Sequence, residues 1–251
     1  MKSHCENWRT NISRLVKGQI PFMFSVSQSQ TILQCGGKDV RMDCFVPEGD
    51  VPQSGTQRFP AVIGLHGSGG GHMSMAEPAT MLARQGFAVY VLHYFDRTGD
   101  ERVNDKATIL RNSPAWLKTI WEALNFVEKQ SQVDAKRIGL LGFSLGAYLA
   151  LTMAAFDSRV GAVVEFFGGF PKEIKLFMRR LCPVLILHGE ADTTVPVQEA
   201  YDLKELLERR EQPYEIQIYP GAGHGFAGEV WRDAGLRTLN FLRRYLEAPQ
   251  P

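Results

Sequence analysis

The chain has 251 residues, of which 44% are hydrophobic and 22% charged, and its formal net charge is +1. That length suits one large α/β domain, which buries enough apolar surface to fold without disulfide or metal cross-links. The near-neutral charge excludes a broad basic field of the kind that binds nucleic acid or an anionic membrane.

The N-terminal stretch from Met1 to Ser25 carries no signal-peptide pattern, because polar and charged residues such as Glu6 and Arg9 interrupt it. No stretch of the chain reaches the apolar length of a membrane span. The four cysteines form no CxxC pair, which favours buried thiols in a reducing compartment: Cys5, Cys35, Cys44 and Cys182. We therefore expect a soluble, cytoplasmic protein that binds neither membranes nor nucleic acid. The sequence leaves the oligomeric state unknown.

The first sixty residues differ in pattern from the rest. We expect an N-terminal extension over residues 1–30 and an edge hairpin with its loop over residues 31–58. Thr31–Cys35 and Lys38–Val46 are the two expected hairpin strands, joined at Gly36-Gly37. Because no internal repeat or low-complexity linker divides the chain, we expect one domain over residues 1–251.

From Pro60 onward, short apolar runs alternate with helical patterns. Strands are expected at Pro60–Leu65, Phe87–His93, Arg137–Gly142, Val160–Phe167, Pro183–His188 and Tyr214–Tyr219. Helices are expected at Met75–Arg84, Ala115–Lys129, Ser144–Phe156, Lys172–Arg180, Val197–Arg210 and Trp231–Tyr245, and a polar loop at Asp96–Asn112. The strands are continuously apolar, as strands covered on both faces must be. The pattern predicts an α/β fold with a mostly parallel, doubly wound sheet of about eight strands and helices on both faces.

The segment Gly142-Phe143-Ser144-Leu145-Gly146 is a G-x-S-x-G motif between an expected strand and an expected helix. A sharp turn at that junction lifts the serine hydroxyl clear of the sheet, and glycines at the flanking positions avoid steric clashes. The start of the helix also supplies N–H groups and a positive dipole beside a reacting carbonyl. The motif predicts Ser144 as a nucleophile; the alternative is a serine that only caps a helix.

A nucleophilic serine needs a base and an acid that orients the base. Asp192 follows the strand that ends at His188, at the edge of the sheet where open α/β folds place their sites. Glu190 is the alternative acid. His224 lies between glycines in a loop after the last strand, so the order Ser144, Asp192, His224 fits a hydrolase triad.

The oxyanion of an acyl-transfer intermediate needs two backbone N–H donors. One is expected from Leu145, directly after the nucleophile. The other is expected from the turn after the strand Pro60–Leu65, with the N–H of Ser68 favoured and that of Gly67 second. The same glycine-rich turn lacks the residues of a nucleotide-binding loop, so nucleotide binding is not expected. The six histidines form no metal-ligand pair at helical spacing, and acyl transfer by a serine needs no cofactor, so neither a metal nor a cofactor is expected.

With these contexts in place, the chain resembles the dienelactone hydrolase family of α/β-hydrolases. The segments that carry the resemblance are LHGSGGG from Leu65, GFSLGAYLA from Gly142, LHGEADTTVP from Leu187 and YPGAGHGF from Tyr219. The last two segments are equally similar to the catalytic domain of prolyl-oligopeptidase-type peptidases. The resemblance covers Lys38 to Leu246 and implies the α/β-hydrolase fold and a small-molecule ester or lactone as substrate.

The sequence departs from dienelactone hydrolases proper in three ways. Those enzymes use a cysteine nucleophile, where this chain has Ser144, and a glutamate in the oxyanion turn, where it has Gly67. They also bind the substrate carboxylate with two arginines. The resemblance offers Arg97 for one of them, an exposed loop arginine being the alternative, and Gly228 stands near where the other would lie. A general serine carboxylesterase fits these departures better than the dienelactone reaction.

The sequence thus predicts a serine hydrolase that cleaves a carboxylic ester or lactone, with Phe143 and Arg97 as candidate substrate-binding residues. Three alternatives stay open: a peptidase or aminoacyl esterase using the same triad, a cofactor-free haloperoxidase or acyltransferase, and a non-catalytic binding protein of the same fold. Only Asp96–Asn112 and Gly168–Arg180 are candidate lid segments, and a lid that short favours small or medium esters.

Overall fold

The structure, a computed structural model, describes residues 23–48, 58–174, 178 and 180–247. Most of the expected N-terminal extension and Cys5 therefore lie outside the described residues. The described strands are β1 (Ser25–Cys35), β2 (Lys38–Glu48), β3 (Phe59–Leu65), β4 (Ala88–Leu92), β5 (Val133–Phe143), β6 (Val160–Phe166), β7 (Val184–Gly189) and β8 (Tyr214–Tyr219). The α-helices are α2 (Ala76–Arg84), α3 (Lys106–Val127), α4 (Leu145–Phe156), α5 (Gln198–Arg209) and α6 (Gly228–Leu242).

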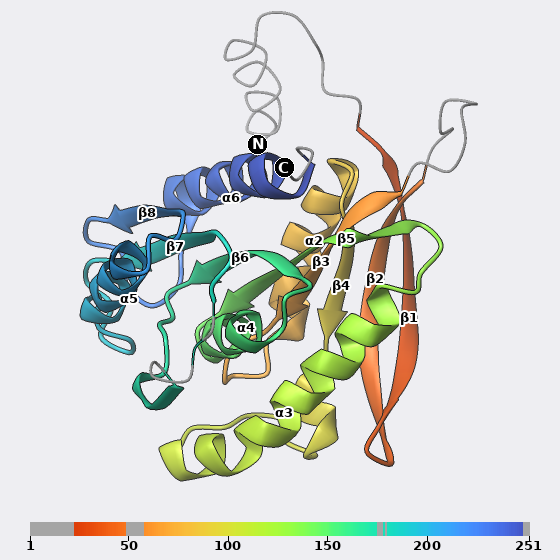
Figure 1. The fold of residues 1–251 in the computed structure, drawn as a ribbon, viewed down its shortest axis with the longest axis horizontal. Coiled ribbons are helices and arrows are strands. Elements are labelled where there is room, and N and C mark those ends of the chain that lie inside the picture. The colour runs from red at the N-terminus through yellow and green to blue at the C-terminus, as the bar shows by residue number, and fades with distance from the viewer. Residues whose placement is uncertain (1–22, 49–57, 175–177, 179, 248–251) are drawn as a thin grey trace, which may run out of the picture.

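The strands form one sheet of eight, in the order β1-β2-β4-β3-β5-β6-β7-β8 (Figure 1). All pairs from β4 to β8 are parallel, whereas β1 and β2 are antiparallel at one edge and turn at Gly36-Gly37. Both glycines have positive φ, 53° and 75°, which suits the two-residue turn of a hairpin. The predicted mostly parallel sheet is confirmed.

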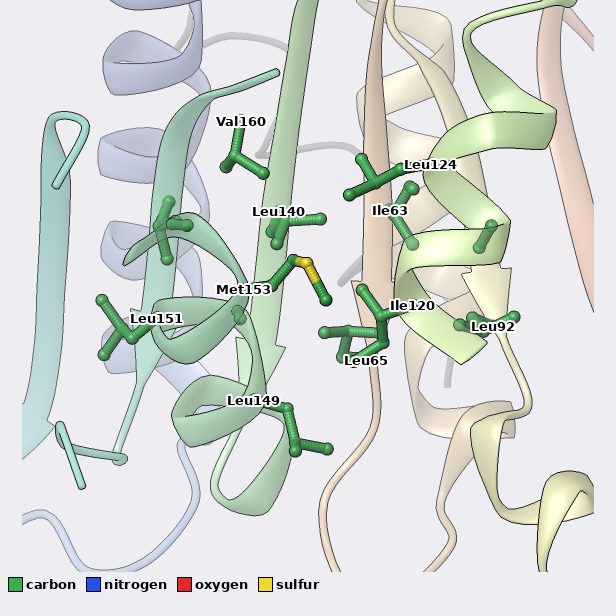
Figure 2. Packing of buried hydrophobic residues seen from close by; sticks show 14 of the residues in the cluster. Ile63, Leu65, Leu92, Ile120, Leu124, Leu140, Leu149, Leu151, Met153 and Val160 are labelled. Carbon is green, nitrogen blue, oxygen red and sulfur yellow. The ribbon is translucent and has the colours of Figure 1, made fainter. Parts of the chain in front are cut away.

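Helices cover both faces of the sheet, and each face has its own apolar cluster. The helices α3, α4 and α5 bury one face, and α2 and α6 bury the other. Figure 2 shows the first cluster, in which Ile120 of α3 and Leu149 and Met153 of α4 lie among Leu65 of β3 and Leu140 of β5. Continuous burial on both faces is why the central strands carry no polar alternation.

One expectation was wrong: of the polar loop expected at Asp96–Asn112, only residues 98–105 are a loop, and the rest is helical. A short 3-10 helix, η2 (Tyr94–Arg97), follows β4, and α3 begins at Lys106, nine residues before the expected start at Ala115. Pro114 lies inside α3, where sequence patterns indicate a helix start or break. The helix starts before Pro114 because the Asp105 carboxylate accepts the N–H of Thr108 at 2.8 Å and caps the first turn of α3.

Other boundaries differ by a few residues. α6 begins at Gly228 and continues through a π-helical turn, η4 (Arg243–Glu247), rather than spanning Trp231–Tyr245. Of the short helix expected at Lys172–Arg180, the structure has a 3-10 turn, η3 (Lys172–Ile174), and residues 175–177 and 179 lie outside the described part. A further 3-10 turn, η1 (His72–Met75), precedes α2. Cys35, Cys44 and Cys182 are free, buried thiols.

Candidate active site

Ser144 stands at the junction of β5 and α4, with φ 51° and ψ −115°. A non-glycine residue with positive φ is strained by about 1–3 kcal/mol and persists only where its surroundings hold it. Here the Ser144 N–H donates to the carbonyl of Phe166 at 2.9 Å, and its own carbonyl accepts the N–H of Ala147 at 2.9 Å. The serine is thereby fixed beyond the end of the sheet.

The two motif glycines are required by close backbone contacts rather than by their own φ angles. A Cβ on Gly142 would collide with the backbone of Gly146, one turn further along. A Cβ on Gly146 would collide with the carbonyl oxygen of Leu65, at the end of β3. Any side chain at either position would push α4 away from the sheet and displace Ser144.

His224, in the loop between β8 and α6, lies beside the serine. Its Nε2 is 3.0 Å from Ser144 Oγ, and its Nδ1 is 2.8 Å from Asp192 Oδ2. A neutral imidazole that donates Nδ1–H to a carboxylate presents its Nε2 lone pair to the serine hydroxyl. This tautomer is the one that can remove the hydroxyl proton.

Asp192 is held rigidly behind His224. It is only 7% exposed, and its Oδ1 accepts the N–H groups of Thr194 and Val195 at 2.8 and 2.9 Å. The other oxygen is thus left for His224. The alternative acid, Glu190, is exposed, while Asp192 makes the hydrogen bond.

His188, at the end of β7, is a second histidine near Asp192 that sequence reasoning assigned only to a strand. Its side chain is fully buried, its Nε2 donates to the Val195 carbonyl at 2.9 Å, and the same nitrogen lies 3.5 Å from Asp192 Oδ2. Burial lowers the pKa of His188. A neutral His188 leaves His224 as the imidazole whose charge Asp192 can stabilise.

Leu145 and the Gly67 turn, the expected sources of the oxyanion donors, lie near the serine, and their donor roles stay a prediction. Leu145 is the first residue of α4, so its N–H has no acceptor within the helix. The turn after β3 passes close by, since a Cβ built on Gly67 would lie 3.4 Å from the Cβ of Ser144. The carbonyl of Ser68 accepts the N–H of Val103 at 2.9 Å, which holds this turn in place.

The two candidate substrate-binding residues have structural partners. Phe143 is 8% exposed and packs edge-on against Phe166, with ring centroids 4.9 Å apart. Arg97 ends η2, and its Nη1 donates to the carbonyl of Gly36 at the turn of the edge hairpin, at 3.1 Å. That contact gives Arg97 a role in holding the hairpin, and its binding of a substrate carboxylate stays a prediction.

Phe167 is a site residue that the sequence did not single out. Its φ is 42°, and its ring lies edge-on to the His224 imidazole, with centroids 4.9 Å apart. Its N–H donates to the carbonyl of Leu187 at 2.8 Å, which ties it to β7. No local sequence signal marks a phenylalanine for positive φ, so only the tertiary contacts reveal it.

A cavity of about 730 Å³ adjoins the turn after β3. His66 and Gly70 of that turn line one side, and Asp100 and Glu101, which follow η2, line another. The triad side chains are not among its lining residues, which also include Ile32 and Arg41 of the edge hairpin and His93 just after β4.

The described residues form neither a metal site nor a membrane span. No group of three or more His, Cys, Asp or Glu residues in the described part of the chain could hold a metal ion. Among the same residues, no helix is long and apolar enough to cross a membrane.

The architecture and the hydrogen-bonded serine, histidine and aspartate define the class of protein, an α/β-hydrolase. A crystal structure of a protein described as a dienelactone hydrolase from Klebsiella pneumoniae matches with a TM-score of 0.73, covering 88% of this chain and all 100% of that one at 20% identity. At that identity the match shows the fold alone. The model of the dienelactone hydrolase family matches residues 49–236, so the chain belongs to the dienelactone hydrolase family. It is a hydrolase of the class that acts on esters or lactones, which confirms the resemblance seen in the sequence.

Two curated relatives differ in how much of their length is matched. A protein of Yersinia pestis described as a carboxymethylenebutenolidase is 27% identical over 192 residues, which are 70% of this chain and 71% of that protein. The acyl-coenzyme A thioesterase 5 of Mus musculus is 36% identical over 129 residues, which are 51% of this chain and 27% of that protein. The match to the thioesterase is thus confined to about a quarter of its length.

Proposed function

We propose that the protein cleaves a carboxylic ester or lactone by acyl transfer, with Ser144 as nucleophile, His224 as general base and Asp192 as the orienting acid. The observation that carries the proposal is the continuous chain of hydrogen bonds, 3.0 Å from Ser144 Oγ to His224 Nε2 and 2.8 Å from His224 Nδ1 to Asp192 Oδ2. These lengths lie within the range for proton transfer to an adjacent base.

In the first step, His224 removes the hydroxyl proton as Ser144 Oγ attacks the carbonyl carbon. Asp192 keeps the imidazole in the required tautomer and stabilises its charged form. The oxyanion lies between the N–H of Leu145 and that of Ser68 or Gly67, each donor contributing about 3 kcal/mol to transition-state stabilisation. His224 then protonates the leaving alkoxide. In the second step, His224 removes a proton from water as it attacks the acyl-enzyme, and then returns a proton to Ser144 as the acid is released.

The first test is hydrolysis of a short-chain p-nitrophenyl ester by the purified protein and by Ser144→Ala. We expect turnover by the natural protein and a loss of about 10⁶-fold in kcat in the variant, the size seen when a triad nucleophile is removed. Circular dichroism of both proteins checks that the variant is folded. Equal rates in the two proteins would refute the serine mechanism.

Substrate choice is tested with a matched panel. Esters, lactones and amides of the same acyl group separate an esterase from a peptidase, because an amide leaving group is harder to expel. A coenzyme A thioester belongs in the panel, since the match to acyl-coenzyme A thioesterase 5 favours thioester cleavage as the second candidate. Hydrolysis of the thioester at a kcat/KM above that of every oxygen ester would favour the second candidate.

Arg97 is tested with acidic and neutral esters of equal size. If its guanidinium leaves Gly36 to bind a substrate carboxylate, Arg97→Ala lowers kcat/KM for the acidic ester only. An equal effect on both esters assigns Arg97 to the hairpin contact alone.

A further inference from the structure

Glu165 is a buried carboxyl group that the proposed mechanism does not use. It lies on β6 and is 0% exposed. Its Oε2 accepts the N–H of Gly168 at 2.8 Å, whereas its Oε1 is buried with no hydrogen-bond partner among the described residues. A buried carboxylate with an unpaired oxygen is costly, so this geometry favours a proton on Oε1.

The carboxyl group lies directly behind the nucleophile turn. On the sheet, Glu165 pairs with Gly142, two residues before Ser144. Its partner Gly168 packs against the first turn of α4: a Cβ there would collide with that of Ala147 and lie 3.2 Å from the Ser144 carbonyl oxygen. The hydrogen bond between Glu165 and Gly168 therefore supports the turn that carries both Ser144 and the Leu145 N–H.

Ionisable groups near Glu165 include Tyr148 of α4, and the charges of Glu199 on α5 and Asp192 after β7 also act on that tyrosine. Lys172 of η3 pairs with Glu199, 3.9 Å away. Among the described residues, no lysine, arginine or histidine pairs with Glu165. Burial raises the pKa of Glu165 from 4.5 to about 8.

We propose that Glu165 is a positioning residue that must be protonated for turnover, because it supports the nucleophile turn and keeps negative charge away from the oxyanion site. The proposal rests on the proposed function. During acyl transfer, negative charge develops beside the Leu145 N–H in the first turn of α4. An ionised Glu165 behind that turn opposes the developing charge, and the low-dielectric core screens the repulsion poorly.

The first test is the pH profile of kcat/KM for Glu165→Gln. A glutamine matches the neutral acid: its oxygen accepts the Gly168 N–H and its amide carries no charge. We expect the natural enzyme to lose about tenfold in kcat/KM per pH unit above about pH 8, as one ionisation requires. The variant keeps its activity at pH 7 and does not show this alkaline fall. The matched control Glu205→Gln, an exposed carboxyl on α5, keeps the natural profile.

An identical alkaline fall in Glu165→Gln and the natural enzyme would overturn the proposal.

The second test needs no substrate. A carboxyl whose pKa is higher in the folded than in the unfolded protein stabilises the fold below its unfolded pKa, and this contribution is lost as pH rises toward the folded pKa. The advantage of Glu165→Gln in urea unfolding should therefore grow between about pH 4.5 and pH 8. Parallel curves refute a protonated Glu165, whatever esters are cleaved. A growing advantage in a protein that cleaves none of the panel supports the protonated state and refutes only the catalytic role.

Discussion

The ring of Phe167 lies edge-on to the imidazole of His224, with centroids 4.9 Å apart and planes at 62°. His224 sits in a loop. Besides the two hydrogen bonds of the imidazole, the contact with the Phe167 ring restricts the rotation of the imidazole. Phe167 is in turn tied to β7 through its N–H and to Phe226 through an edge contact at 5.3 Å. The geometry of the base thus depends on a residue outside the triad.

We predict that Phe167→Ala lowers kcat/KM for a p-nitrophenyl ester by about threefold to tenfold. An edge contact between aromatic rings is worth about 0.5–1.5 kcal/mol, and losing it lets the imidazole turn away from Ser144. The matched control is Phe156→Ala, at an exposed phenylalanine on α4, which should leave kcat/KM unchanged. If Phe167→Ala only lowers the melting temperature and retains full kcat/KM, the ring supports the fold and not the base.

The choice between Asp192 and Glu190 yields a prediction that separates them. Asp192→Asn should reduce kcat by about 10⁴-fold, because an amide at that position favours the wrong imidazole tautomer while keeping the shape. Glu190→Gln should stay within about twofold of the natural enzyme, since its side chain is exposed and the hydrogen bond to His224 comes from Asp192. The measurement is kcat of both variants on one ester. A larger loss of kcat in Glu190→Gln than in Asp192→Asn would make Glu190 the acid.

Stability should respond to the close contact at Gly146. Gly146→Ala places a methyl group against the Leu65 carbonyl, and we expect it to cost several kcal/mol of folding free energy, in the upper range for point mutations. Gly235→Ala, in α6 with open space around its Cα, should raise stability by up to about 1 kcal/mol. Urea unfolding compares the two. An unchanged free energy of unfolding in Gly146→Ala would mean that α4 can move away from β3.

Because His188 is buried, we predict that the free energy of unfolding falls at acidic pH. Burial lowers the pKa of His188 below 6.5, so the folded protein holds fewer protons than the unfolded chain as pH falls through 6.5. Stability is therefore lost as pH decreases below that value. Gln in place of His188 keeps a donor for the Val195 carbonyl but cannot titrate.

Urea unfolding of the natural protein and His188→Gln at pH 5, 6 and 7 measures this contribution. The free energy of unfolding of the natural protein should fall more steeply toward pH 5 than that of the variant. Equal slopes would show that His188 does not contribute to acid sensitivity.

The sequence by itself predicted the fold class and the order of the site residues. The apolar strands were recognisable because both faces of the sheet are buried. Ser144 was recognisable because the turn between strand and helix leaves no space for side chains at Gly142 and Gly146, so the constraint is local and visible in residue type. The structure places Ser144, Asp192 and His224 in one hydrogen-bonded chain, and their catalytic roles stay a prediction.

Only the tertiary structure decided what depends on residues distant in the chain. The start of α3 before Pro114 depends on the Asp105 cap and on packing, and these outweigh the local signal of a proline. The positive φ of Phe167, its contact with His224 and the direction of Arg97 toward Gly36 arise between separate elements. The unpaired oxygen of Glu165 behind the nucleophile turn belongs to the same class, because burial is a property of the assembled core and no single segment encodes it.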